Sequence, residues 1–245
     1  MSAPGSAFWD QSAYDVRCEW GPAGLAALDA ISDVVIIVDV LSFSSCVDVA
    51  VARGAIVYPF AGEDAAGFAR RVGGVLVGRA SASLPFSVSA LLAVEAGACL
   101  VLPSPNGSAL SAAARAAVVL TGCLRNASAV AAAAAAHGRT IAVIPAGERW
   151  PAGGALRPAA EDLIGAGAII AHLPGRLSPE AKLALAAFRA VADDLPAFLA
   201  ACSSGREHAA RGTAADVALA ARLDASQAVP RLLNGAYRDA GGGEA

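Results

Sequence analysis

Residues 33–39, Asp33-Val34-Val35-Ile36-Ile37-Val38-Asp39, decide the fold class of this 245-residue chain. Five consecutive apolar residues stand between two aspartates, with no alternation of apolar and polar positions. A strand with this pattern is buried on both faces, as in a parallel sheet that helices cover on each side. The stretch therefore predicts a strand at 34–38 in the interior of an α/β protein.

Short apolar runs recur along the chain and alternate with alanine-rich segments of helical pattern. Further strands are predicted at 16–20, 56–60, 75–77, 99–102, 118–120 and 141–144. Helices are predicted at 45–53, 63–71, 88–96, 108–116, 127–137, 159–172, 179–192, 195–201, 205–211 and 214–221. This alternation predicts a three-layer α/β/α fold with a largely parallel or mixed sheet and a helix-rich C-terminal part.

The last strand signal ends near Ile144, and this boundary suggests how the chain is organised. We expect residues 1–145 to form the sheet region and residues 146–238 to form a helix-rich part packed on it. That second part either caps the sheet or supplies a further strand. Residues 239–245 are expected to be a flexible tail. The Pro- and Gly-rich segment 147–158 is the clearest long loop and is expected to form a wall of the site.

Composition restricts the classes of function. Hydrophobic residues make up 56% of the chain, charged residues 16%, and the net charge is −3. No uncharged stretch reaches the roughly 20 apolar residues of a membrane span without breakers, and no signal peptide is visible. No basic cluster favours nucleic acid. The five cysteines show no C-x-x-C spacing, which favours a reducing cytoplasm. We therefore expect a cytoplasmic protein with neither a membrane nor a nucleic-acid partner.

Ligands of open α/β sheets bind beyond the carboxyl ends of the strands, so the residues that follow each strand are the site candidates. Asp39 ends the strand at 34–38, and Ser42, Ser44 and Ser45 lead into the next helix. Asp39 could hold a divalent cation or act on a phosphate, with the serines lining the same pocket. A capping role at the helix start explains the same pattern.

Two later strands are followed by similar loops. Asn106, Gly107 and Ser108 form either a phosphate-binding loop or a plain turn that ends in a helix cap. Arg125 and Asn126 follow the strand at 118–120. The guanidinium of Arg125 could pair with a phosphate or a sulfonate, or it could form a surface ion pair.

A fourth candidate combines Gly147 with the acidic pair Glu161 and Asp162. Carboxylates in a first helical turn complement the helix dipole. Gly165 and Gly167, however, suggest that this helix packs closely against another backbone, and acidic groups held rigidly near the sheet could bind a metal. The three histidines (His137, His172 and His208) stand alone and are interpreted as helix-end or surface residues.

Taken in chain order, these segments resemble the 2-phosphosulfolactate phosphatase family. Residues 35–41 look like its first strand and acidic turn, and residues 104–110 are similar to its Asn-Gly loop. The remaining matches are its Asn-Ala helix start at 124–131, its Ala-Gly and Glu-Asp elements at 146–148 and 161–167, and its C-terminal portion at 203–230. The resemblance covers roughly residues 33–238.

The resemblance implies a phosphoric monoester hydrolase that uses Mg²⁺ to hydrolyse the phosphate ester of a small acidic metabolite in coenzyme M biosynthesis. It also implies a possible homo-oligomer. On this basis Asp39, Glu161 and Asp162 are expected to be catalytic and to bind Mg²⁺, with Asp39 either a ligand or the nucleophile. The expected substrate-binding residues are Ser42, Ser44, Ser45, Asn106, Gly107, Ser108, Arg125, Asn126 and Gly147.

Two segments depart from the family pattern. Ser42-Phe43-Ser44 stands where Arg-Ala-Thr is expected, so an anion-binding guanidinium is absent. Residues 84–89 stand where a Gly-Asn-Ser-Pro type of segment is expected. The predicted substrate is therefore 2-phosphosulfolactate or a related phosphorylated hydroxy acid. The alternative is a non-catalytic protein that binds a small anion on the same fold.

Overall fold

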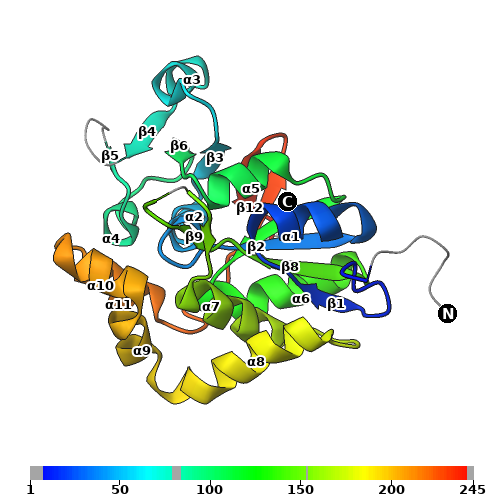
Figure 1. Ribbon diagram of the computed structural model, residues 1–245. Helices are drawn as coiled ribbons and strands as arrows, with labels where there is room; N and C mark the ends of the chain where they lie inside the picture. The colour runs from blue at the N-terminus through cyan, green and yellow to red at the C-terminus, as the bar shows by residue number, and fades with distance from the viewer. Residues whose placement is uncertain (1–7, 79–83, 153, 242–245) are drawn as a thin grey trace.

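The computed structural model describes residues 8–78, 84–152 and 154–241. These residues form an α/β structure around a ten-stranded mixed sheet, with strand order β1-β8-β2-β7-β11-β12-β3-β6-β4-β5 (Figure 1). The predicted strand at 34–38 is β2 (Val34–Val38), and all five of its residues are buried. The predicted fold class is confirmed.

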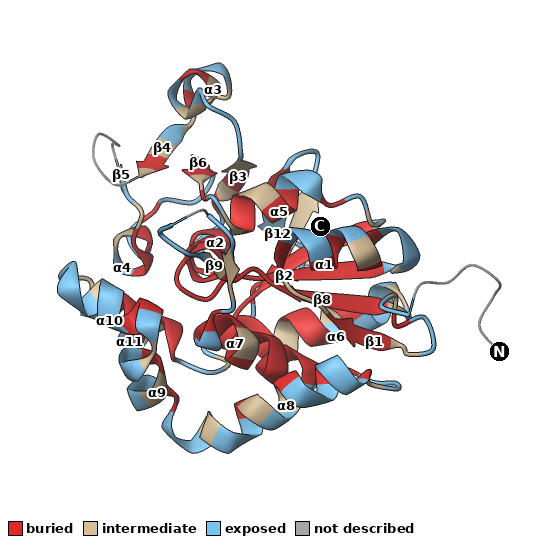
Figure 2. Ribbon diagram, in the orientation of Figure 1, coloured by how far each residue is buried: buried red, intermediate tan, exposed pale blue. Residues whose placement is uncertain are grey.

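The first half of the sheet contains parallel strands only. Its members are β1 (Val16–Cys18), β8 (Ile141–Pro145), β2 and β7 (Val118–Gly122). Val34, Ile36 and Val38 pack on the side of α6 (Ala127–His137) and α7 (Ala160–Ile170). Val35 and Ile37 pack on the side of α1 (Gly21–Leu28) and α5 (Gly107–Ala113). Helices therefore cover both faces of β2, which explains why it contains no polar residue (Figure 2).

The second half of the sheet contains the parallel strands β3, β6, β4 and β5. Their bounds are β3 (Ile56–Phe60), β6 (Cys99–Pro103), β4 (Val75–Gly78) and β5 (Leu84–Pro85). The helices of this half are α2 (Phe43–Ala52), α3 (Ala65–Arg71) and α4 (Val88–Leu91). Phe43 at the start of α2 packs edge-on against Tyr237, with ring centroids 6.1 Å apart.

A C-terminal hairpin joins the two halves of the sheet. It consists of β11 (Pro230–Leu233) and β12 (Ala236–Asp239), and each strand pairs antiparallel with its neighbours. The C-terminal part therefore supplies strands to the sheet, the second of the two arrangements expected from sequence, and Ile144 does not mark the last strand. Asp239 ends β12, so the predicted flexible tail does not begin there, and residues 242–245 of that tail lie outside the described residues.

The remaining helices wrap one side of the molecule. They are α8 (Pro179–Val191), α9 (Leu195–Ala201), α10 (Ser203–Ala210) and α11 (Ala214–Ala220). The predicted long loop at 147–158 contains a small hairpin of β9 (Glu148–Arg149) and β10 (Leu156–Arg157). None of the helices in the described residues has the length and apolar character needed to cross a bilayer.

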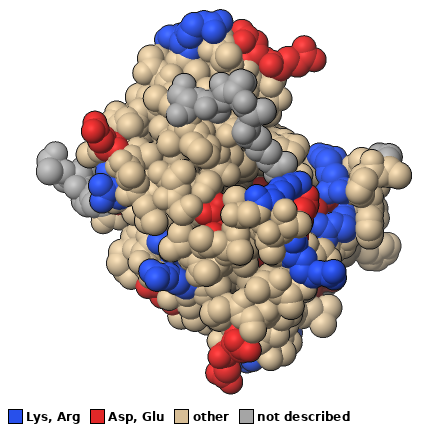
Figure 3. Space-filling view, turned by 90° about the vertical axis from the view of Figure 1, so that its left-hand side faces the viewer, with Lys and Arg blue, Asp and Glu red and all other residues tan. Residues whose placement is uncertain are grey.

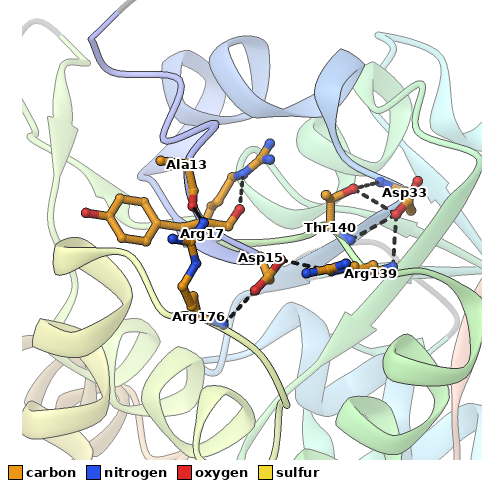
Figure 4. Close-up of polar contacts among 8 residues, drawn as sticks. Ala13, Asp15, Arg17, Asp33, Arg139, Thr140 and Arg176 are labelled. Carbon is orange, nitrogen blue, oxygen red and sulfur yellow. Dashed lines mark hydrogen bonds and ion pairs between the residues drawn. The ribbon is translucent and has the colours of Figure 1, made fainter. Parts of the chain in front are cut away.

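A polar network ties the amino ends of β1, β2 and β8 together (Figure 4). The Asp33 carboxylate accepts hydrogen bonds from the backbone N–H groups of Arg139 and Thr140 and from Thr140 Oγ1 at 2.8–2.9 Å. The Asp15 carboxylate accepts from the Arg176 N–H at 2.8 Å and from Arg139 Nε at 3.1 Å. Backbone hydrogen bonds are the main reason that the pKa values of both aspartates lie below their ordinary value. This network fastens the end of the sheet opposite to Asp39.

Candidate active site

A cavity of about 350 Å³ opens among the loops that follow β2, β6 and β8 and the C-terminal end of α10. Its polar lining residues are Asp39, Ser42, Ser87, Ser104, Asn106, Glu148, His208, Arg211 and Thr213. Leu41, Gly78, Pro85, Pro105 and Phe86 complete the described part of the wall. Figure 3 shows the side of the molecule that carries α4 and α10, where acidic and basic atoms lie close together near the middle of the face.

Asp39 lines this cavity and is only 5% exposed. Its Oδ1 atom accepts a hydrogen bond from the Phe43 N–H at 3.1 Å, and its Oδ2 atom accepts one from the Gly107 N–H at 2.9 Å. Asp39 therefore caps the starts of α2 and α5 and also faces the cavity, so the two interpretations made from sequence are compatible. Gly107 is required here because a Cβ atom would lie 2.1 Å from Phe43 Cδ1.

The acidic pair expected beside Asp39 lies behind the cavity wall. Asp162 Oδ1 accepts from the Val40 N–H at 2.7 Å, and Asp162 Oδ2 accepts from the Gly147 N–H at 2.9 Å. This carboxylate thus joins the loops that follow β2 and β8. Glu161 is 1% exposed, and its Oε2 atom accepts a weak hydrogen bond from Cys202 Sγ at 3.4 Å. Neither side chain lines the cavity.

The acidic residues around Asp39 interact electrostatically. Burial, and then the charges of Glu148 and Glu161, raise the pKa of Asp39 from 3.8 to about 7. Burial, and then the charge of Asp39, raise the pKa of Asp162 well above its ordinary value. Burial also raises the pKa of Glu148. The hydrogen bond from Asn106 lowers this pKa and so offsets part of the effect of burial. In the absence of a cation, these carboxyls therefore hold protons at higher pH than ordinary carboxyls do.

The fit of a metal ion to this site depends on which carboxylates reach the cavity. Among the residues that the structure describes, no group of three or more His, Cys, Asp and Glu side chains is placed to hold a metal ion. The expected set of Asp39, Glu161 and Asp162 is therefore not a preformed metal cage. Asp39 and Glu148, however, both line the cavity. One or two carboxylates plus substrate oxygens and waters are the usual ligands of Mg²⁺, so this pair fits the ion.

The predicted serines and Asn106 divide into two groups. Ser42 and Asn106 line the cavity, and Asn106 Nδ2 donates to Glu148 Oε2 at 3.0 Å. Ser44, Ser45 and Ser108 are buried, with their hydroxyls bonded inside the protein. Their partners are the Asp39 N–H and Thr121 Oγ1 for Ser44, the Val40 carbonyl for Ser45 and the Leu102 carbonyl for Ser108. The hydroxyls of these three serines stabilise the backbone at the ends of β2 and β6 and do not face the cavity.

Arg125 and Asn126 do not reach the cavity. The Arg125 guanidinium donates from Nε to Asp48 Oδ2 at 2.8 Å and from an Nη atom to the Leu219 carbonyl at 3.0 Å. Asn126 is fully buried and bonds the Cys123 N–H and the Ala228 carbonyl. The ion pair of Arg125 is thus internal and not at the surface, because the loop after β7 packs under the C-terminal segment.

Six polar residues of the cavity wall were not predicted as site residues: Ser87, Ser104, Glu148, His208, Arg211 and Thr213. Glu148 follows Ala146 and Gly147 directly after β8. This position after a strand could have identified Glu148 as a site residue from the sequence. His208, Arg211 and Thr213 lie on or just after α10, where nothing in the local sequence distinguishes them from surface residues. His208 contacts Ser42, which is 166 positions away in the chain, so only the folded structure reveals this pair.

Two carboxylates, an amide and basic side chains share one cavity at the ends of sheet strands, which defines an α/β protein built to bind a small polar ligand. Residues 23–235 match the family model described as 2-phosphosulpholactate phosphatase. The chain belongs to that family, which confirms the resemblance found in the sequence, and the family name indicates a phosphatase, a hydrolase. No curated protein matches the chain.

Proposed function

We propose that this protein is a Mg²⁺-dependent phosphatase that hydrolyses the phosphate ester of 2-phosphosulfolactate or of a related phosphorylated hydroxy acid. The observation that carries this proposal is the position of Asp39, an oriented carboxylate that lines the cavity in a member of a phosphatase family. If the substrate is 2-phosphosulfolactate itself, the reaction serves coenzyme M synthesis, as the resemblance implies.

The size and polarity of the cavity suit such a substrate. A volume of about 350 Å³ is at the small end of ligand-binding pockets. A phosphate ester brings about −1.5 to −2 charges at neutral pH. The cavity wall already contains the carboxylates of Asp39 and Glu148, so a bound phosphate requires compensating positive charge. Arg211 on the wall is already paired with Glu207, so a divalent cation would supply most of the compensating charge.

Mg²⁺ is proposed to bind at Asp39 and Glu148. When bound, this ion neutralises charge on the phosphate and polarises its oxygens. The protein groups keep the two carboxylates in position. The Phe43 and Gly107 amides fix the orientation of Asp39, and Asn106 Nδ2 holds Glu148 Oε2. Phosphoryl transfer depends mostly on such positioning and charge stabilisation, so disturbing either carboxylate should cost activity.

The test is phosphate release from a panel of small phosphate esters, assayed with Mg²⁺ and with EDTA. The panel contains 2-phosphosulfolactate, phospholactate, phosphoglycolate and glycerol phosphate, which carries no second acid. We expect release from at least one acidic ester in Mg²⁺ and none in EDTA. Asp39→Asn should abolish release, and Glu148→Gln should raise the Mg²⁺ concentration needed for half-maximal rate. Glu63→Gln, at an exposed carboxylate outside the cavity, is the matched control. Full activity of Asp39→Asn would refute the proposal.

A protein that only binds small anions behaves differently in the same experiment. Its thermal midpoint rises with the ligand, because binding to the native state stabilises it, but no phosphate is released under any condition. That result would replace the phosphatase with the binding protein considered from the sequence.

A further inference from the structure

Three cavity residues form a hydrogen-bonded chain that the proposed Mg²⁺ site does not use. Ser42 Oγ lies 3.3 Å from His208 Nε2, and His208 Nδ1 lies 2.9 Å from Thr213 Oγ1. All three side chains line the same cavity as Asp39. Ser42 immediately precedes α2, whereas His208 and Thr213 belong to α10 and the turn after it. The contact between α10 and the loop after β2 creates the chain.

The hydrogen bonds of Thr213 determine where the proton of His208 lies. Thr213 Oγ1 donates its single proton to the backbone carbonyl of His208 at 3.1 Å. The same oxygen must then accept the hydrogen bond at His208 Nδ1, so Nδ1 carries the proton. When the imidazole is neutral it has one N–H group, so the lone pair of Nε2 then faces Ser42. The Ser42 hydroxyl therefore donates to His208 Nε2.

A hydroxyl that donates to a base, with a third group orienting that base, is the signature of an activated nucleophile, and the contacts are often long before substrate binds. The other described serines of the cavity differ. Ser87 Oγ donates to Asp216 Oδ1, and Ser104 Oγ accepts from the Asn106 N–H. Among the cavity serines that the structure describes, Ser42 is the one in contact with a nitrogen base. Ser42 also stands where the family resemblance places an arginine.

We propose that Ser42 is the nucleophile of this site, that His208 is its general base, and that Thr213 is a positioning residue. Ser42 Oγ attacks phosphorus, the bond to the leaving alkoxide breaks, and the Ser42 proton passes to His208 Nε2 and then to the alkoxide. Water next attacks the phosphoserine with His208 as base, which releases phosphate and restores Ser42. The choice of a phosphate ester rests on the proposed function. Both carboxylate oxygens of Asp39 accept hydrogen bonds from backbone amides, and in this scheme Asp39 is a ligand of the proposed cation and not the nucleophile.

The first test uses a fluorophosphonate reagent, which reports an activated serine without knowledge of the substrate. Attack of Ser42 on its phosphorus expels fluoride and leaves a stable adduct. We expect peptide mass spectrometry to find the adduct on Ser42, and Ser42→Ala to lose it. His208→Gln should slow labelling by about 10²- to 10⁴-fold, the usual contribution of a positioned base. Ser203→Ala is the matched control, since Ser203 is an exposed serine at the start of α10 outside this cavity.

Thr213 gives a second readout that a purely structural role would not produce. Thr213→Val removes the oxygen that holds the His208 proton on Nδ1, so labelling should slow, whereas Thr213→Ser keeps that oxygen and should restore the rate. Circular dichroism of each variant separates lost chemistry from lost folding. Equal labelling rates in wild type, Thr213→Val and His208→Gln would overturn the proposal, as would an adduct on a residue other than Ser42.

The outcomes separate this inference from the phosphatase assignment. With an ester that is turned over, rapid acid quench should trap phosphoserine at Ser42, and Ser42→Ala should lose turnover. If Ser42→Ala releases phosphate at the wild-type rate, Ser42 is not the nucleophile, but the phosphatase stands. If no ester is turned over while Ser42 is labelled in a His208-dependent manner, the activated serine stands and the phosphatase assignment fails.

Discussion

Asp39→Asn tests the electrostatics of the site through protein stability alone. Burial and the neighbouring charge of Glu148 raise the pKa of Asp39 from 3.8 to about 7 in the folded protein. Between these two values the folded state holds a proton that the unfolded chain has released. The free energy of unfolding therefore falls as pH rises from about 4 to about 7, and this contribution is constant above pH 7.

The size of the effect follows from the pKa. Each pH unit in this window is worth about 1.36 kcal/mol. Between pH 5.5 and pH 8.5, only the part below about pH 7 contributes, so Asp39 should lower the free energy of unfolding by about 2 kcal/mol. With a urea m value of about 2 kcal/mol/M, the midpoint should move by about 1 M. Asparagine does not titrate, so Asp39→Asn removes this contribution.

The assay is urea unfolding in EDTA at pH 5.5 and pH 8.5 for wild type, Asp39→Asn and the control Glu63→Gln. Asp162 and Glu148 also have raised pKa values, so each adds its own loss of stability as pH rises. The informative quantity is therefore the wild-type loss minus the Asp39→Asn loss. Asparagine cannot accept the hydrogen bond from the Gly107 N–H. The loss of this bond lowers the stability of Asp39→Asn equally at both pH values. If wild type and Asp39→Asn lose the same stability, the raised pKa of Asp39 is refuted.

Three further predictions concern packing, charge pairing and metal binding. Gly107→Ala forces a Cβ atom against the ring of Phe43. It should lower the free energy of unfolding, measured in urea, by about 1–3 kcal/mol, and it should also lower phosphatase activity. An unchanged midpoint would contradict the close contact. Arg125→Met leaves the buried Asp48 carboxyl without its partner, so calorimetry should show a loss of about 3–5 kcal/mol. Adding Asp48→Asn should recover part of that loss, and no recovery would argue against the pair. Mg²⁺ at about 100 times its dissociation constant should stabilise wild type at pH 8.5 by about 2.7 kcal/mol. Equal stabilisation of Asp39→Asn would place the ion elsewhere.

Much of the architecture could be predicted from local sequence pattern. The uninterrupted apolar run of β2 and the helical pattern of α6 and α9 have the same bounds in the structure as in the prediction. The hairpin of β11 and β12 was missed because its strands are short and charged residues interrupt them. Its turn, Asn234-Gly235, has positive φ values of 51° and 81° and was the available signal.

Local pattern could not predict which side chains face the cavity. Ser44, Ser45 and Ser108 look the same as Ser42 in the sequence, yet their hydroxyls bond the protein interior while Ser42 meets His208. Which direction a loop side chain takes depends on the element packed against it, and that element comes from a distant part of the chain.

The two aspartates that bracket β2 show the same division. The five apolar residues between Asp33 and Asp39 predict a buried strand from local pattern alone, because a strand covered on both faces needs no polar positions. Tertiary structure decided that the two carboxyls differ. Backbone N–H groups of Arg139 and Thr140, just before β8, lower the pKa of Asp33 at the surface, whereas burial and Glu148 raise the pKa of Asp39. Charge stabilisation depends on which groups surround a carboxylate, and only the folded chain brings those groups together.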